Sequence, residues 1–496
     1  MTNYAKKAAR GIAAATSIGF FAMIASYAFQ VLLARGLSQT SFGLFSSVFS
    51  LMVVVHTFHD PGFKAALIKM IPEYLVRKDV PGLNRLVSTT LTAWIALSGL
   101  YSVVLILLSS VLATYYFKVP ESAVLIVLLA ISFVLNSFDY LIGYVFQGFQ
   151  RIGLYASVDL SRSVLLFALT LCGLWILPGS PVVPATVYIL VSIILTVAYL
   201  PLLKRVFPEG KIMPVLDSKI LKHMFFFGMP FTLVYLFYGF FQKLSVLFLT
   251  AFSSYIDVAF FNVAIPVTGL MLNATAAIAA VLYPLTSELW TRGLHEKLGK
   301  GVAFVYKYSI MAAVPLTLVF VMFASLFLRL LFGESYVGAA PALIVLACGS
   351  FFWVLANITF HVLAGIGKTM ETLKIMLGIG VLNIVLHAIL VPVFGLLGAV
   401  ISLSTTYVLT MLISILVLKK YAPIGLGLLF WVKTFFAGAL FAGILALAKF
   451  ILVLQNAYAN ALLAIIVASV IYGLLLIGLK LVNIAELLSL RRSMFR

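Results

Sequence analysis

Charged residues are scarce in this chain. They make up 9% of the 496 residues, whereas 64% are hydrophobic and the mean hydropathy is +1.19. A soluble globular protein carries roughly 25% charged residues, so this chain lacks the polar surface that a soluble fold of its size needs. The scarcity excludes a soluble protein and indicates a polytopic membrane protein.

Long polar segments are also missing. The longest lie at residues 64–86, 204–221 and 287–301, and none could hold a soluble domain. A membrane glycosyltransferase or polymerase needs extramembrane loops with paired carboxylates, so we expect no enzyme. A transporter fits better. The two cysteines, Cys172 and Cys348, lie inside apolar runs, and we expect them to be packing residues rather than a disulfide.

Apolar runs dominate the chain, and about 14 are long enough to span a membrane, which takes about 20 residues. The first follows a short basic segment and continues to about residue 33, which indicates a membrane helix rather than a cleaved signal. The runs lie at 12–34, 42–62, 87–112, 122–149, 152–176, 184–203, 222–250, 258–286, 302–330, 338–364, 370–391, 396–418, 427–451 and 458–482.

The formal charge of +19 comes from 33 basic against 14 acidic residues. When the N-terminus is placed inside and the spans alternate, most of the basic residues lie in inner loops and tails. Cytoplasmic loops of membrane proteins carry such an excess. We therefore expect a multi-pass protein of the cell membrane with both termini cytoplasmic, and no nucleic-acid partner.

The chain repeats itself at an offset of about 217 residues. FQGFQRIG at 146–153 aligns with LAGIGKTM at 363–370, so Gly148 matches Gly365 and Arg151 matches Lys368. Six spans in each copy give both copies the same orientation, and such parallel repeats are typical of transporters whose two bundles enclose a cavity. We predict two lobes, 1–215 and 216–422, around a central cavity, with two additional helices and a tail at 423–496.

The Gly-Lys-Thr of the second copy resembles the end of a phosphate-binding loop. That loop requires a glycine at position 362, where the chain has Val362, and a preceding strand. We therefore expect no ATP and a tight turn between two helices.

Three segments resemble a known family. Residues 32–54, 59–87 and 360–421 are similar to the polysaccharide-transporter branch of the multidrug/oligosaccharidyl-lipid/polysaccharide (MOP) flippase superfamily. Asp60, Gly62 and the IPEY sequence of residues 71–74 follow that branch's D-x-G…IPEY pattern. The resemblance implies two six-helix lobes and two extra helices that move a lipid-linked oligosaccharide from the cytoplasmic to the outer leaflet.

Charged residues inside spans are costly and usually face a cavity. We predict that Arg162, Lys243 and Lys307 meet the pyrophosphate of a lipid carrier, and that Lys368 anchors helix ends or meets arriving phosphates. Alternatives stay open. Arg162 could pair with Asp139 or Asp159, and Lys307, Lys374 and Lys433 could extend to the cytoplasmic surface.

Asp139 and Asp159 are the candidates for proton or sodium coupling, because only an acid can exchange a cation at that depth. His56, His59 and Asp60 form a weak metal-binding pattern at the expected cytoplasmic end of a span, so we expect no metal. We expect no cofactor and a monomer in contact with membrane lipids. The alternative function is a cation-coupled multidrug exporter, which the excess of basic over acidic residues within the spans disfavours.

Overall fold

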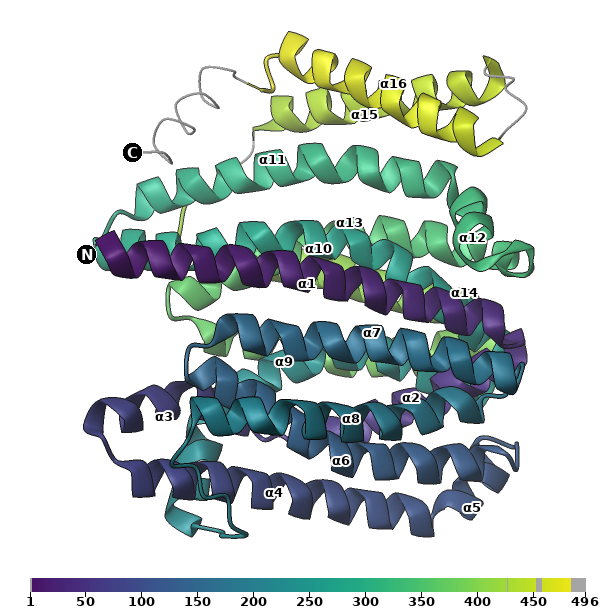
Figure 1. Cartoon of the computed structure of the whole chain (residues 1–496). Helices are drawn as coiled ribbons and strands as arrows, with labels where there is room; N and C mark the ends of the chain where they lie inside the picture. Colours follow the sequence, from purple (N-terminus) through teal and green to yellow (C-terminus); the bar gives the residue numbers. More distant parts are fainter. Residues whose placement is uncertain (1, 426, 452–456, 483–496) are drawn as a thin grey trace. The chain divides into compact units, whose positions relative to one another are not determined.

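The computed structural model describes residues 2–425, 427–451 and 457–482, without the side chains of 2–15, 230–238, 272–281, 284, 449–451 and 457. In this part of the chain there are helices, turns and short extended connections, and no strand (Figure 1). The expected all-helical membrane fold is confirmed. The α-helices are α1 Thr2–Gly36, α2 Gln39–Thr57, α3 Phe63–Arg77, α4 Val80–Leu107, α5 Ser109–Val111, α6 Ser122–Gly148, α7 Ile152–Ile176, α8 Val182–Val206, α9 Ser218–Phe252, α10 Tyr255–Thr291, α11 His295–Met322, α12 Ala324–Phe332, α13 Ala340–Gly365, α14 Thr369–Leu418, α15 Leu428–Ile451 and α16 Ala457–Gly478. A π-helical turn, Leu112–Tyr116, and a 3-10 turn, Glu334–Ala339, complete them.

The predicted spans agree with these helices. Eleven helices among the described residues are long and apolar enough to cross a membrane. One of them, α14, holds two predicted spans, and α9 and α10 contribute the shorter apolar segments Gly239–Phe252 and Tyr255–Met271. All 14 predicted runs therefore lie on helices. The run at 302–330 is divided between α11 and α12.

The polar segment 64–86, expected as a connection, instead forms α3 and the first turns of α4. α3 is amphipathic, with Phe63 and Leu67 buried on one face and Lys69 exposed on the other. The carboxylate of Asp79 accepts the Gly82 N–H at 2.8 Å and so caps the start of α4. α3 is too short and too polar to be recognised as a membrane span, because only one of its faces is apolar.

α14 is a hairpin rather than a continuous rod. A straight helix of its 50 residues would be about 75 Å long, more than twice the hydrocarbon thickness. Gly395 interrupts it with a φ of 53° and a ψ of −125°, and the backbone of Gly398 folds back to within contact of Leu390. Glycine fits this position because a side chain is strained at that φ and a Cβ would stand 3.0 Å from the Ser253 hydroxyl.

The two aligned turns have the same backbone. After α6, the Arg151 N–H donates to the Phe146 carbonyl at 2.8 Å, and after α13 the Lys368 N–H donates to the Leu363 carbonyl at 2.7 Å. The left-handed residue is Gln150 (φ 59°) in the first turn and Gly367 (φ 77°) in the second. This identity of hydrogen bonds and dihedrals supports the sequence repeat and the predicted tight turn.

The chain forms two compact units. Unit 1 contains residues 1–263 and 384–399, and unit 2 contains 264–383 and 400–496. In unit 1, α6 packs against α2, α3, α4, α7 and α8, while α9 packs against α2 and α3 (Figure 1). In unit 2, α11 packs against α13 and α15, and α15 against α16. The division predicted from the repeat, at residues 215 and 422, stays a prediction.

The two cysteines were expected to be packing residues, but they do not lie in a core. Cys172 on α7 and Cys348 on α13 are both unpaired and exposed. A thiol behaves as a small apolar group, so an outward-facing position on a membrane helix suits it.

Candidate functional site

Unit 1 contains a cavity of about 800 Å³. Its walls come from α2, the connection to α3, α3 itself, α4, α6 and α9. Seven of its lining side chains are aromatic or imidazole rings, and two are lysines, Lys64 and Lys243, against one acid, Asp60. We call this space the unit 1 cavity. Its size suits a ligand of small-molecule dimensions.

Lys243 on α9 is one of the residues that line the unit 1 cavity. Its Nζ lies 5.7 Å from the centroid of the Phe49 ring. Among the described residues, no carboxylate oxygen approaches this ammonium within the 4.0 Å of an ion pair. An uncompensated lysine within a membrane helix is costly, and such residues mark pathways for ions or substrates.

Asp60 and Gly62 explain why the connection between α2 and α3 has a D-x-G sequence. The carboxylate of Asp60 accepts the backbone N–H of Lys64 at 3.2 Å, which stabilises the first turn of α3. Burial raises the pKa of Asp60 above its ordinary value of 3.8. Gly62 has a φ of 106°, and a Cβ there would stand 2.1 Å from the backbone of Gly228. The glycines therefore let α9 approach this connection closely.

His56 lies in the last turn of α2 and His59 two residues beyond its end, which agrees with their expected position at the end of a span. Both side chains also line the unit 1 cavity. The two rings stack with centroids 4.0 Å apart, and His59 also stacks on Trp94 at 5.6 Å. His59 is 3% exposed, and burial lowers its pKa to about 2, so it is neutral. No group of three or more metal-ligating side chains occurs among the described residues.

Arg162 forms an ion pair with Asp139, one of the two alternatives left open by the sequence. Its Nη2 lies 2.9 Å from the Asp139 Oδ2, and its guanidinium stacks over Tyr140 with Cζ 4.2 Å from the ring centroid. Asp139 is 1% exposed and the Arg162 side chain 15%. Arg162 is not among the residues that line the unit 1 cavity, but it contacts Tyr140, which is. Asp159, one turn away on α7, is exposed.

Three cavity residues on α6 were not predicted. Tyr140, Tyr144 and Gln147 follow each other at intervals of four and three residues, which places them on one helix face. That spacing is a signal the sequence offers, but it does not distinguish a cavity from a core. We call these three residues the α6 stripe.

The remaining predicted residues lie in unit 2. Lys307 on α11 has its Nζ 5.5 Å from the Tyr308 ring, and Lys368 has its Nζ 5.1 Å from the Tyr421 ring. Lys433 on α15 donates a hydrogen bond to the carbonyl of Leu479 at 2.8 Å. The exposed Lys374 lies 3.3 Å from Glu371. The side chains of Tyr235 and Tyr238 on α9 lie outside the described residues.

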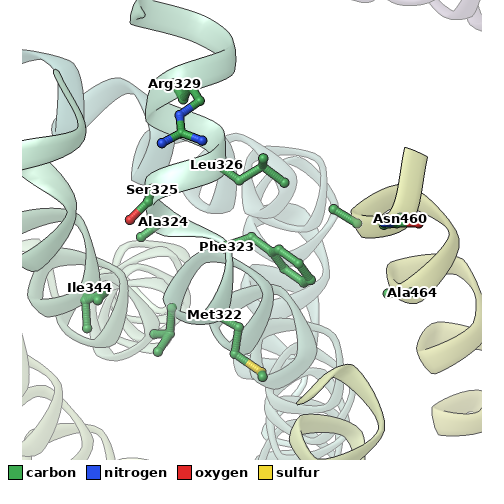
Figure 2. A pocket seen from close by; sticks show the side chains of 11 residues that line it. Met322, Phe323, Ala324, Ser325, Leu326, Arg329, Ile344, Asn460 and Ala464 are labelled. Carbon is green, nitrogen blue, oxygen red and sulfur yellow. The ribbon is translucent and has the colours of Figure 1, made fainter. Parts of the chain in front are cut away.

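Unit 2 also contains a smaller pocket of about 310 Å³ between α12 and α16 (Figure 2). Figure 2 shows Arg329 at its rim, above Phe323 and Met322 and opposite Ala464. The Arg329 Nη2 already donates to Glu334 at 2.8 Å. The positive charge of Arg329 is therefore compensated by the carboxylate of Glu334. The charge of Lys243 in the unit 1 cavity has no such acidic partner among the described residues.

The fold is similar to that of two membrane transport proteins of known structure. The chain superposes on the lipid II flippase MurJ in an inward closed conformation with a TM-score of 0.76 at 12% identity, covering 92% of this chain and 97% of that one. An inward-facing multidrug resistance MATE family transporter of the MOP superfamily superposes with a TM-score of 0.61 at 19% identity, covering 81% of this chain and 96% of that one. These structures establish the fold.

The sequence then gives the family. The chain belongs to the polysaccharide biosynthesis protein family, whose pattern matches residues 8–290. The uncharacterized membrane protein MJ1068 of Methanocaldococcus jannaschii is 25% identical over 506 residues, covering 98% of each chain. The resemblance to the polysaccharide-transporter branch is thereby confirmed.

Proposed function

We propose that the protein is a flippase that moves a lipid-pyrophosphate-linked oligosaccharide from the cytoplasmic to the outer leaflet by alternating access. Lys243 carries this proposal, because its ammonium faces the unit 1 cavity and has no acidic partner among the described residues. Membership of the polysaccharide biosynthesis family supports a glycan cargo.

The charges of the unit 1 cavity favour an anionic ligand. Lys64 and Lys243 line it together with Asp60, whose carboxylate binds the backbone of the α3 start. Diphosphate oxygens would accept charge-assisted hydrogen bonds from both ammonium groups. Such a ligand offsets the cost of holding Lys243 within the membrane. We also propose that Lys307 and Lys368 of unit 2 contribute to substrate binding.

A coupling cation that drives transport would need an acidic side chain to bind it, and Asp139 and Asp159 are the two candidates. Asp139 is engaged with Arg162, so a coupling cation at Asp139 would compete with the guanidinium. Asp159 is exposed on α7 and carries the coupling role more readily. Without a coupling ion, the membrane potential supplies about 2.3 kcal/mol per charge per 100 mV. The direction of transport is the one that the resemblance to the polysaccharide-transporter branch implies, and the basic residues of the predicted cytoplasmic loops support only the orientation of the protein.

The alternative function is a cation-coupled multidrug exporter, which the likeness to a MATE fold keeps open. An exporter of drug cations needs an uncompensated carboxylate in its cavity. The unit 1 cavity instead offers an uncompensated ammonium, which disfavours a cationic cargo by charge repulsion.

The test reconstitutes the purified protein in proteoliposomes and follows a fluorescent prenyl-diphosphate oligosaccharide by dithionite accessibility. A charge-assisted hydrogen bond contributes about 1.5–3 kcal/mol, so Lys243→Ala should slow flipping by about tenfold to a hundredfold. Lys243→Arg should retain most of the rate. The matched control is Lys300→Ala, which removes the same charge from a side chain that is 76% exposed and should leave the rate unchanged. Wild-type flipping by Lys243→Ala, or transport of an organic cation instead, contradicts the proposal.

A further inference from the structure

The α6 stripe is a part of the cavity wall that has no role in the proposed binding of the diphosphate by Lys64 and Lys243. The rings of Tyr140 and Tyr144 lie nearly parallel, with centroids 6.2 Å apart and an interplanar angle of 19°. Gln147 continues the same face one turn further along α6. Two amphipathic rings and an amide thus follow each other along one wall of the cavity.

Neighbouring side chains fix both rings. The Arg162 guanidinium covers Tyr140 at 4.2 Å, and the Lys64 ammonium lies 4.8 Å from the Tyr144 centroid. Trp94 lies against Tyr144 at 5.9 Å. Side chains that are ordered beforehand lose little conformational entropy when a ligand binds, so this wall is preorganised.

The polar atoms of the α6 stripe have hydrogen-bonding capacity left over. The buried Gln147 Oε1 has no partner in the described part of the protein, and no described residue bonds the hydroxyl of Tyr140 or Tyr144. Other tyrosines of the chain do form such bonds; Tyr199 bonds Ser157 at 3.1 Å and Tyr472 bonds the Met311 carbonyl at 3.0 Å. A buried polar atom without a partner costs about 1–3 kcal/mol, so a ligand that supplies partners binds favourably.

We propose that the α6 stripe is a sugar-binding subsite that holds one ring of the glycan head group. A sugar ring combines apolar C–H surface for the tyrosine rings with hydroxyls that donate to Gln147 and exchange hydrogen bonds with the two phenols. An apolar lipid chain would leave these polar atoms unpaired. An organic cation would meet Lys64 and Arg162, which already lie over the ring faces.

This subsite rests on the proposed function, because it places the diphosphate at Lys243 and the first sugar beside it. The sugar ring binds to α6 and the diphosphate to α9 and α3, and all three helices line the same cavity. The glycan therefore contributes affinity that the diphosphate alone does not.

Calorimetry on the purified full-length protein separates the two contributions. The probes are citronellyl diphosphate and its derivatives carrying one glucose, one N-acetylglucosamine or one glucuronic acid. At least one sugar derivative should bind about tenfold more tightly than the sugar-free probe. Tyr144→Phe and Gln147→Leu should each reduce that gain about fivefold, equivalent to one hydrogen bond, without changing the affinity for citronellyl diphosphate. Tyr115→Phe, at a 78% exposed tyrosine, is the matched control and should change nothing.

Each outcome decides between the two proposals. If citronellyl diphosphate binds in a Lys243-dependent manner and no sugar improves binding, the subsite is wrong and the proposed function stands. A sugar gain that persists in Tyr144→Phe and Gln147→Leu also overturns the subsite. If the purified wild-type protein is folded, as judged by its elution and its melting, and binds none of the probes, both proposals fail.

Discussion

Removing Arg162 should destabilise unit 1 by an amount that the ion pair allows us to work out. Arg162→Ala leaves the carboxylate of Asp139, 1% exposed, without its partner 2.9 Å away. Breaking one side of a buried ion pair costs about 3–5 kcal/mol. Unit 1 has roughly 280 residues, and an unfolding entropy of about 2.1 cal/mol/K per residue gives about 0.6 kcal/mol/K. The apparent Tm in detergent should therefore fall by about 5–8 °C, as measured by fluorescence-detected size-exclusion chromatography.

A double variant separates stability from transport. Arg162→Met with Asp139→Leu replaces both charges by apolar side chains, which is often neutral or stabilising, so the Tm should return to that of the wild type. If the guanidinium also meets the substrate, flipping stays lost in this stable double variant. If Arg162 acts only as a structural partner of Asp139, flipping recovers together with the Tm.

Two results for the Arg162 variants would contradict the role given to the ion pair. An unchanged Tm in Arg162→Ala would mean that Asp139 finds water or another partner at no cost. If the double variant is as unstable as Arg162→Ala, the loss of stability comes from the missing contact between the Arg162 side chain and Tyr140. It then does not come from the unpaired charge of Asp139.

Three smaller predictions concern local geometry and can be checked by the same thermal assay. Gly148→Ala should destabilise by about 1–3 kcal/mol, because a Cβ would stand 2.6 Å from the Ile71 side chain, whereas Gly153→Ala, with nothing within 4 Å, should be neutral or stabilising. Gln150→Gly should stabilise by up to about 1 kcal/mol, since glycine adopts a φ of 59° without strain. The raised pKa of Asp60 means that the folded state binds its proton more tightly than the unfolded state, so stability falls as pH rises above 3.8. Asp60→Asn should therefore be more stable than the wild type at neutral pH, and the difference should disappear below pH 3.8; a pH-independent difference would contradict this.

The helices could be predicted because each carries its own signal. A run of about 20 apolar residues predicts a span wherever it occurs, and the shared Gly-and-base sequence after α6 and α13 predicts two equal turns. α3 was missed because its signal is a narrow apolar stripe over 15 residues, interrupted by Lys64 and Lys69. The two halves of α14 are predicted as separate apolar runs, 370–391 and 396–418, and Pro392 and Gly395 lie between them.

The site depends on which helices meet, and a single sequence carries little of that information. Lys243 could be predicted as a cavity residue because its charge is costly in a membrane. His56, Tyr140 and Gln147 are compatible with a core, an interface or a cavity, and only the packing of α2 against α6 decides between these. Arg162 illustrates the same limit, because the sequence offered Asp139 and Asp159 as partners and the structure selected the residue on a different helix.

The chain passes between the two units within helices and not within loops. The passages lie between Val263 and Ala264 in α10, and at Asn383–Ile384 and Ala399–Val400 in α14. A hydrogen-bonded helix transmits torque along its axis, whereas a flexible linker absorbs it. The units are therefore not separable modules, and a protein divided after residue 263 would have a severed helix on each side. The connection 207–217 between α8 and α9 is the place where the polypeptide can be split into two co-expressed halves with every helix whole, and the sequence repeat predicts the start of its second copy close to the same place.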